Sequence, residues 1–446
     1  MIRHAFVRFI PLLVLTSPAL GAAQTAGAPP NEQAAAKALD AAARRDIVAK
    51  LSEELRERYV FPDVGERAAV RITKAMEAGE YDGLPDQVAF TQRLSSDVHA
   101  IARDKHLNIM SPGGRPPPGF APSTRPIDEA GITRADKLPG GIGYIEVVGF
   151  PPHEAFKPVL DRAMSALEGS RSLIIDVRRN GGGSPESVAY FVSYLMNPGL
   201  PLTTIVSRTP KTKEFTRKTY SSVATPVSFA KVPVIVLTSK DTFSGGEDFA
   251  YTAQSFKRGT IVGEVTGGGA NPTGPVDLGH GVMASIPFGR SENPVTKTNW
   301  EGRGVQPDIA VAASQGLGVA LQRGGLKSAK EVQAVSVERV FTPRTTALPG
   351  HEAAIRRLVV GLASGQPDYS RMAPRFADLI RRDLSRLHSE VSPLGELRSI
   401  KFRQPMMGGD EFVLRFANGS RLMPVVLGQD GKIIAALPPI PAPPEE

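Results

Sequence analysis

The sequence predicts an α/β protein in which a central β/α section lies between an N-terminal helical domain and a C-terminal α+β domain. In the N-terminal part, apolar residues recur at helical spacing. The central part alternates short, continuous apolar runs with helical patterns, which is typical of buried strands and their connecting helices. The last part carries two helical faces and then strands separated by hairpin signals. A chain of 446 residues also suits two or three domains better than one.

The N-terminus has the order of a secretory signal. Arg3 and Arg8 are followed by an apolar run over residues 9–15 and then by small residues. The run is too short, and too interrupted by prolines, to span a bilayer. We therefore expect a signal peptide over 1–23, a disordered leader over 24–40, and a mature chain without a stable membrane anchor. An exported protein, periplasmic or extracellular, is the predicted product.

Composition excludes several classes of protein and site. The chain contains no cysteine, so disulfides, thiolate nucleophiles and cysteine-ligated metals are all excluded. A formal net charge of +8 is modest for this length, and no lysine/arginine block with interleaved aromatic residues occurs. The basic residues therefore indicate a solvated surface and no nucleic-acid partner. The sequence predicts neither a cofactor nor a metal site.

Residues 41–111 are predicted to form a small domain of three helices. The first ends before Phe61, the second covers about 64–76, and the third follows Asp86. Their apolar stripes must pack on each other or on a neighbouring element.

His106 lies where the third helix changes to a short apolar, extended segment. At such a boundary a side chain can reach a neighbouring cleft, although a lone histidine is more often structural. The segment that follows is rich in proline and glycine, and we expect a linker over 112–138.

The predicted catalytic β/α domain spans 139–320. A buried strand over 173–177 leads into Gly181, Gly182 and Gly183, which precede a helix. Consecutive glycines free the backbone to present N–H groups, as oxyanion and phosphate sites require. A phosphate-binding loop would need a lysine followed by serine or threonine, which is absent here. A plain tight turn remains the alternative.

Ser244 lies where a second buried strand, over 234–237, turns into a helix. Unpaired N–H groups and the positive end of the helix dipole would stabilise negative charge that develops at this point. The position therefore suits a nucleophile. The alternative is that Ser244 only caps the helix, since serine is a preferred cap.

The remaining parts of a serine-hydrolase site also occur at the ends of predicted elements. Such a site needs a nucleophile, a base, a group that orients the base, and oxyanion donors. The chain offers Ser244, His106, Glu301, and the N–H groups of Gly183 and Gly245. Spacing alone does not show that they converge, and a carboxylate such as Glu301 is usually a surface group.

A second linker is expected over 321–348, followed by a C-terminal domain over 349–446. Two helices precede four strands, and Asn-Gly and Asp-Gly hairpin signals predict an antiparallel meander for the last three. Pro424 predicts that its strand lies at an edge or contains a bulge. No catalytic constellation is present in this domain.

Four ordered motifs closely resemble the tail-specific (C-terminal processing) serine peptidase family, and more narrowly its interphotoreceptor-retinoid-binding-protein-like branch. The resemblance also includes 104–107 (DKHL), covers roughly 40–312, and is weaker in the C-terminal domain. The four motifs are 173–183 (LIIDVRRNGGG), 242–250 (TFSGGEDFA), 262–269 (VGEVTGGG) and 299–309 (NWEGRGVQPDI).

The resemblance implies a ClpP/crotonase-like spiral core that carries the site, covered by the helical domain. It implies Ser244 as nucleophile and His106 as base, acting on a polypeptide substrate. Similarity to the tricorn-protease core implies that Glu301 assists, with Gly183 and Gly245 as oxyanion donors.

The chain departs from the family pattern in three respects. Many members use a serine–lysine dyad, but Gly269 occupies the position of that lysine, so a lysine mechanism is not expected. Lys105, and not a serine, stands beside the histidine. No peptide-docking (PDZ) segment lies between the helical and β/α sections. Glu247, one helical turn after Ser244, competes with Glu301 as the orienting carboxylate.

Two functions are compatible with these residues. The first is a secreted or periplasmic serine endopeptidase of a Ser/His/Glu type. The alternative is a catalytically weak or idle protein on the same fold that binds peptides or hydrophobic ligands. The intact serine and histidine favour the first. The oligomeric state and the physiological substrate do not follow from the sequence.

Overall fold

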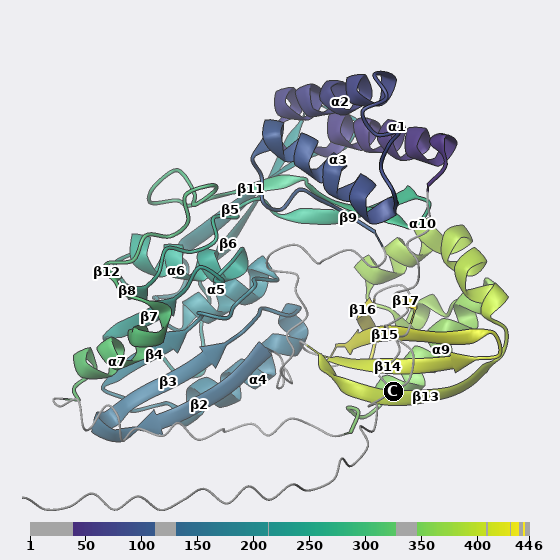
Figure 1. The fold of residues 1–446 in the computed structure, drawn as a ribbon. Coiled ribbons are helices and arrows are strands. Elements are labelled where there is room, and N and C mark those ends of the chain that lie inside the picture. Colours follow the sequence, from purple (N-terminus) through teal and green to yellow (C-terminus); the bar gives the residue numbers. More distant parts are fainter. Residues whose placement is uncertain are drawn as a thin grey trace, which may run out of the picture.

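The structure is a computed structural model that describes residues 39–111, 131–212, 214–326, 346–406, 409–428, 430–436 and 440–441. The predicted signal peptide and most of the predicted leader lie outside these residues, as do large parts of both predicted linkers. Figure 1 shows a central α/β body, a helical body that contains α1–α3, and a C-terminal body of helices packed on a sheet. No helix in the described part is long and apolar enough to cross a membrane.

The central body is built on a six-stranded sheet in the order β12-β8-β7-β4-β3-β2. Its neighbouring strands pair in parallel, except that β2 is antiparallel to β3. The strands are β2 (Ile132–Leu138), β3 (Ile142–Val147), β4 (Ser172–Asp176), β7 (Val234–Thr238), β8 (Thr260–Gly263) and β12 (Ile309–Ala310).

Helices cover both faces of this sheet, which explains why its strands are continuously apolar. On β4, Leu173 and Ile175 pack in the core of the helices on one face, whereas Ile174 joins the core on the other. The first face carries α4 (His153–Ala166), α5 (Pro185–Ser193) and α6 (Gly245–Ser255), and the second carries α7 (Ala313–Arg323).

Strand β2 falls inside the segment that the sequence predicted as a linker over 112–138. Residues 132–138 are a strand and not a linker. The alternation that marks a strand is weak here, because Thr133 and Asp136 are buried polar residues. A further three-stranded sheet, in the order β11-β5-β6, was also not predicted. Its strands are β5 (Pro201–Arg208), β6 (Phe215–Ser221) and β11 (Gly289–Glu292).

The helical body contains α1 (Ala41–Arg58), α2 (Pro62–Glu77) and α3 (Gln87–Ala102), close to the predicted helices. Asp40 and Asp86 cap α1 and α3, because each side chain accepts a hydrogen bond from a free N–H of the first turn. Pro62 begins α2, where a missing N–H is tolerated.

A hairpin from the β/α section completes the core of the helical body. Strands β9 (Thr273–Gly279) and β10 (Val282–Pro287) pair with each other, and β10 pairs with β1 (Asn108–Met110), which follows α3. Val276, Leu278, Val282, Ala284 and Ile286 are buried in one cluster with the helices. Two chain segments far apart in sequence therefore share this core.

The C-terminal body packs two helices on an antiparallel sheet in the order β13-β14-β15-β16, with β17 also paired to β15. The elements are α9 (His351–Ser364), α10 (Pro374–Val391), β13 (Leu397–Met406), β14 (Gly409–Phe416), β15 (Gly419–Leu427), β16 (Ile433–Ala436) and β17 (Ile440–Pro441). Short 3₁₀ helices are η2 (Pro139–Gly141), η3 (Tyr369–Arg371) and η4 (Ser392–Leu394).

Of the two alternatives predicted from Pro424, the edge strand is wrong, whereas β15 does contain a register shift, between Val426 and Leu427. Strand β15 pairs with β14 on one side and with β16 and β17 on the other. Pro424 lies between the residues that pair with β17 and those that pair with β16. A residue without an N–H is tolerated at this interruption because no ladder bond is required there.

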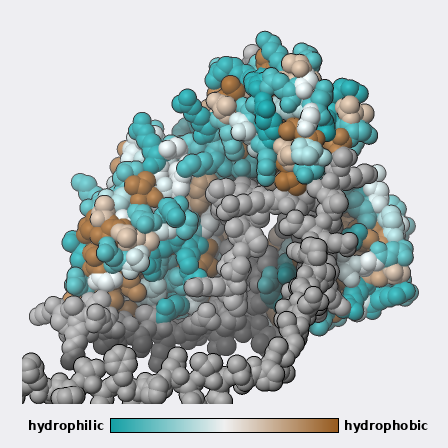
Figure 2. Space-filling model, in the orientation of Figure 1, coloured by the Kyte–Doolittle hydropathy of each residue, from teal (hydrophilic) through white to brown (hydrophobic). Residues whose placement is uncertain are grey.

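The surface of the described residues is mixed in character. On the face drawn in Figure 2, hydrophilic side chains dominate, and smaller hydrophobic areas are interspersed among them.

The shared core predicts that a truncation in the hairpin destabilises the helical body. Ile286 is 1% exposed and belongs to its core. We expect Ile286→Ala to lower the free energy of unfolding by about 2–5 kcal/mol, measured by urea denaturation. Val295→Ala, at a position that is 51% exposed, serves as the control and should change it by less than about 0.5 kcal/mol. Equal stability of the two variants would contradict a core role for the hairpin.

Candidate active site

His106 is held in a tight turn between α3 and β1. Helix α3 ends at Arg103, whose φ of 53° turns the chain sharply. The Asp104 carboxylate then accepts a hydrogen bond from the His106 N–H at 3.0 Å. The imidazole is only 4% exposed and packs on the ring of Phe243, with ring centroids 4.6 Å apart. The base predicted from the helical body therefore contacts the residue before Ser244.

Ser244 lies in a strained turn between β7 and α6. Its φ of 53° and ψ of −118° are rare for a residue with a side chain. A Cβ atom built on Gly182 would lie 2.6 Å from the Cβ and 3.0 Å from the Oγ of Ser244. The serine hydroxyl is thus directly against the glycine turn that follows β4.

Gly183 and Gly245 present free N–H groups beside the serine. Within the described residues neither N–H donates a hydrogen bond. A Cβ built on Gly245 would lie 3.1 Å from the Gly183 nitrogen, so the two groups are neighbours. Gly183 has a φ of 135°, and a Cβ there would lie 1.9 Å from the Phe150 carbonyl oxygen. Only glycine fits this position, and the pair can act chemically as an oxyanion hole.

Glu247 is fully engaged in holding the backbone around the serine. Its Oε2 accepts from the N–H groups of Ser244 at 2.9 Å and Gly269 at 2.8 Å. Its Oε1 accepts from the Gly268 N–H at 2.6 Å and the Thr266 hydroxyl at 2.5 Å. These four donors leave little capacity for a histidine, so the geometry disfavours Glu247 as the orienting carboxylate.

Glu301 has one oxygen engaged and one without a partner. Its Oε2 accepts from the Ala270 N–H at 2.5 Å, whereas its Oε1 is buried and has no hydrogen-bond partner. The neighbouring Trp300 donates its indole N–H to the Gly269 carbonyl at 2.7 Å. Residues 266–271 are called the glycine loop below. Both residues therefore hold the 299–304 turn against the glycine loop by hydrogen bonds.

Asp104, His106 and Glu301 form one cluster. One carboxylate oxygen of each acid and one ring nitrogen of the histidine all lie within 4.8 Å of one another. The His106 Nδ1 is buried without a partner, like the Glu301 Oε1. The predicted base and its predicted orienting carboxylate are therefore close together.

Asp104 is the member of this cluster that sequence reasoning missed. Its Oδ2 accepts from the Tyr59 hydroxyl at 3.1 Å and the Asn271 amide at 2.9 Å. Its position two residues before the histidine was the available signal, because a carboxylate so placed can bond the backbone of the residue two positions on.

Burial governs the protonation of the cluster. Burial and, to a smaller extent, the nearby Asp104 carboxylate together raise the pKa of Glu301 to about 8. Burial also raises the pKa of Asp104 and lowers the pKa of His106 to about 4. Two carboxylates in a poorly solvated space resist double ionisation, and a buried imidazole resists a positive charge.

The space beside Gly269 is filled by two aromatic rings. A Cβ on Gly269 would lie 2.6 Å from the His106 Cε1 and 2.4 Å from the Phe243 Cζ. A side chain at this position would displace both rings. The ammonium of Lys105 donates to the Gly267 carbonyl at 2.5 Å.

Within the described residues, no hydrogen bond joins the Ser244 hydroxyl to the His106 imidazole. The two residues are linked indirectly, because Glu247 ties the Ser244 N–H to Gly269, and Gly269 abuts the His106 ring. Catalytic hydrogen bonds are often long before substrate binds. Ser244, Gly183 and Gly245 thus lie together at the glycine turn after β4, whereas His106 and Glu301 meet at the glycine loop.

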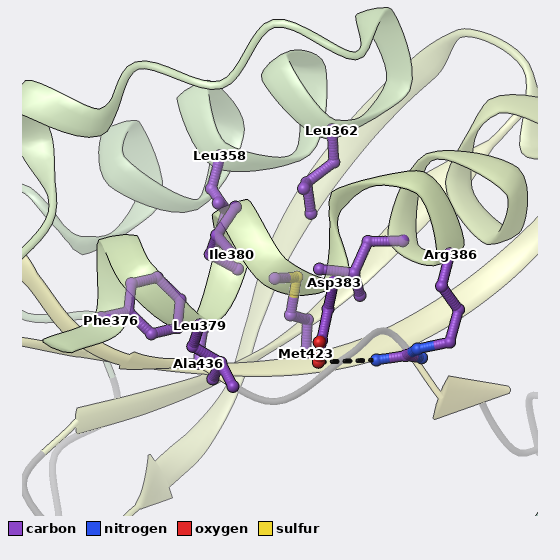
Figure 3. A pocket seen from close by; sticks show the side chains of 10 residues that line it. Leu358, Leu362, Phe376, Leu379, Ile380, Asp383, Arg386, Met423 and Ala436 are labelled. Atoms are coloured by element: carbon purple, nitrogen blue, oxygen red, sulfur yellow. Dashed lines mark hydrogen bonds and ion pairs between the residues drawn. The ribbon is translucent and has the colours of Figure 1, made fainter. Parts of the chain in front are cut away.

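A separate cavity lies in the C-terminal body between α9, α10 and the sheet (Figure 3). Its lining is apolar, with Leu358, Leu362 and Met423 among the side chains, and an Arg386–Asp383 ion pair at 3.5 Å stands at one side. Its free volume of about 40 Å³ is far below the several hundred Å³ of typical ligand pockets. This cavity offers no support for a hydrophobic-ligand-binding function.

A serine at a strand-to-helix turn, two free N–H groups and a buried histidine–carboxylate cluster together define the parts of an acyl-transfer site on an α/β fold. Comparison with known families matches residues 141–311 to peptidase family S41. Residues 32–131 match the N-terminal domain of Peptidase_S41 in eukaryotic IRBP. The chain belongs to peptidase family S41, and the resemblance found in the sequence is confirmed.

Individual relatives are distant. The carboxy-terminal processing protease CtpB of Bacillus subtilis is 25% identical over 211 residues, which cover 46% of this chain and 42% of that protein. The carboxyl-terminal-processing protease of Synechocystis sp. is 28% identical over 233 residues, which cover 50% of this chain and 52% of that protein. The matches thus span about half the length of these curated relatives. A solved structure of the photosystem II D1 C-terminal processing protease has a TM-score of 0.41 at 15% identity, covering 61% of this chain and 94% of that one.

Filling the space at Gly269 should destabilise the site. We expect Gly269→Ala to lower the free energy of unfolding by about 1–3 kcal/mol, because the new methyl group overlaps the rings of His106 and Phe243. Thermal and urea unfolding measure the change. Gly274→Ala is the matched control, since the nearest atom to a Cβ there is 3.7 Å away. A Gly269→Ala protein as stable as this control would show that the imidazole does not fill that space.

Proposed function

We propose that the protein is a serine endopeptidase that hydrolyses peptide bonds in exported proteins or peptides. The observation that carries the proposal is that Ser244 lies beside the free N–H groups of Gly183 and Gly245, while Glu247 links its backbone to the glycine loop that contacts His106 and Glu301. Family membership supports a serine-type peptidase. The signal-like N-terminus supports a periplasmic or extracellular location, and the family resemblance supports a ClpP/crotonase-like description of the core.

Ser244 would attack the scissile carbonyl carbon while His106 takes its proton. The oxygen of the tetrahedral intermediate would accept hydrogen bonds from the N–H groups of Gly183 and Gly245, which do not have to reorganise for the reaction. His106 would then return the proton to the leaving amine. Water would release the acyl group by the same steps in reverse.

Glu301 is the group best placed to steady the imidazolium. A base that accepts a proton on Nε2 must carry a proton on Nδ1, and this N–H needs an acceptor. The unpartnered Glu301 Oε1 and His106 Nδ1 belong to the same cluster. Asp104, already accepting from the His106 backbone, would fix the turn that presents the ring.

Removal of the nucleophile tests the proposal directly. We expect Ser244→Ala to lower the rate of cleavage of an unfolded protein substrate by at least about three orders of magnitude, because no other group can form the acyl intermediate. Labelling by a serine-directed fluorophosphonate should be lost in parallel. Ser221→Ala, on an exposed position of β6, is the control and should behave like the parent. Cleavage by Ser244→Ala at the parental rate would refute the mechanism.

The pH profile tests the role of Glu301. Burial lowers the pKa of His106 to about 4 from an ordinary 6.5, so the imidazole is a neutral base throughout the neutral range. The pKa of Glu301 is raised to about 8, so its carboxyl is neutral below that pH and becomes an acceptor above it. We therefore expect kcat/KM to keep rising between about pH 7 and 9. In Glu301→Gln this rise should vanish. A profile that levels off near 6.5 in both proteins would contradict the assignment.

A further inference from the structure

We propose that Asp104, His106 and Glu301 form a binding site for a divalent transition-metal ion such as Zn²⁺, and that occupancy of this site silences the peptidase. Metal binding stands on the geometry alone. The inhibitory consequence rests on the proposed function, because it requires His106 to be the base.

The ligand atoms already lie in one small volume. One oxygen of each carboxylate and one imidazole nitrogen are all within 4.8 Å of one another. Ligands of a tetrahedral zinc ion, each about 2.0–2.2 Å from the metal, lie somewhat closer together than this. A modest contraction therefore suffices. Among the residues that the structure describes, no other group of three such side chains is so arranged.

Two buried polar atoms of these three residues have no hydrogen-bond partner. The imidazole of His106 is 4% exposed, yet its Nδ1 has no hydrogen bond. The Glu301 Oε1 is likewise buried and unpaired. Buried polar atoms are almost always satisfied, so two orphans in one cluster indicate a missing partner.

No cationic side chain donates a hydrogen bond to either carboxylate in the described residues. The donors that reach them are neutral: the Tyr59 hydroxyl, the Asn271 amide and backbone N–H groups. The ammonium of the neighbouring Lys105 donates instead to the Gly267 carbonyl. A cation could therefore bind between the two carboxyl groups without displacing an ion pair.

The donor set selects the type of ion. Calcium and magnesium prefer oxygen ligands and demand more of them than this cluster offers. One imidazole and two carboxylates suit zinc and similar first-row ions. Hydrogen-bond donors to the carboxylates would orient them for the metal. They are the Tyr59 hydroxyl and the Asn271 amide on Asp104, and the Ala270 N–H on Glu301.

Occupancy would remove the base by a tautomer effect. A neutral imidazole carries one N–H and one lone pair on its two nitrogens. If Nδ1 gives its lone pair to the metal, the proton must lie on Nε2. Nε2 then cannot accept the proton of Ser244. Glu301, as a metal ligand, also ceases to be an acceptor for the histidine.

The test is equilibrium titration of the untagged protein with Zn²⁺, with two readouts besides activity. One is the stoichiometry and heat of binding by calorimetry. The other is fluorescence of Trp300, the single tryptophan of the chain, which directly precedes Glu301. We expect one Zn²⁺ per chain for the parent and for Ser244→Ala, with no response to Mg²⁺.

Substitution of the proposed ligands tests where the ion binds. Glu301→Gln and His106→Asn should weaken Zn²⁺ binding by more than the roughly 10–100-fold that loss of an outer hydrogen bond costs. His153→Asn is the matched control, because the Nδ1 of His153 is also buried and unpaired but lies outside the cluster. It should bind Zn²⁺ like the parent. Thermal unfolding of each variant verifies that it is folded.

The outcomes separate this proposal from the proposed function. No Zn²⁺ binding by the parent at micromolar concentration, or undiminished binding by folded Glu301→Gln and His106→Asn, would overturn the site. Zn²⁺ binding to Ser244→Ala with loss of fluorophosphonate labelling in the Zn²⁺-loaded parent would support it in full. If metal-free parent neither cleaves nor labels, the peptidase function fails while the binding result still decides the metal site.

Discussion

The site depends on a single constraint, which is that the glycine loop has no side chains at 267–269 and is held in place by those of other segments. Glu247 binds it from the serine helix, Glu301 and Trp300 from the turn before β12, and Lys105 from the helical body. The absence of side chains at 267–269 allows these groups to approach the backbone closely. The loop thereby fixes the distance between the nucleophile and the residues proposed to activate it.

This arrangement has an electrostatic cost. Glu247, Asp104 and Glu301 are three carboxylates around one loop, and burial raises the pKa of each. Glu247 is compensated by four hydrogen bonds, which favour its charged form. Asp104 and Glu301 are compensated less well. Strained and incompletely satisfied groups of this kind are concentrated at functional sites, where the surrounding fold maintains them.

Much of this structure could be predicted from the sequence, and the failures have definite causes. Helices α1–α3 and strands β4 and β7 were predictable because caps and apolar periodicity agree along each segment. Strand β2 was missed because its buried face includes Thr133 and Asp136, and polar residues conceal the alternation. The role of the β9–β10 hairpin was missed because a core shared by distant segments leaves no local pattern.

In the candidate site, too, local features could be predicted from the sequence, whereas contacts between distant segments could not. Ser244 and the glycines could be recognised because strand-to-helix turns are local features. The choice between Glu247 and Glu301 could not be made, because it depends on how many donors reach each carboxylate in three dimensions. Asp104 escaped notice for a related reason, since its partners Tyr59 and Asn271 are remote in sequence.

The shared core of the helical body also has a consequence for the timing of synthesis. Residues 41–111 emerge first, but the hairpin that completes their core is made much later. At about 5–20 residues per second, the delay is on the order of ten to tens of seconds. Throughout this interval the segment that carries His106 lacks its β10 partner and the glycine loop does not yet exist. We therefore expect the proposed site to remain incomplete in the nascent chain until its central section has been made.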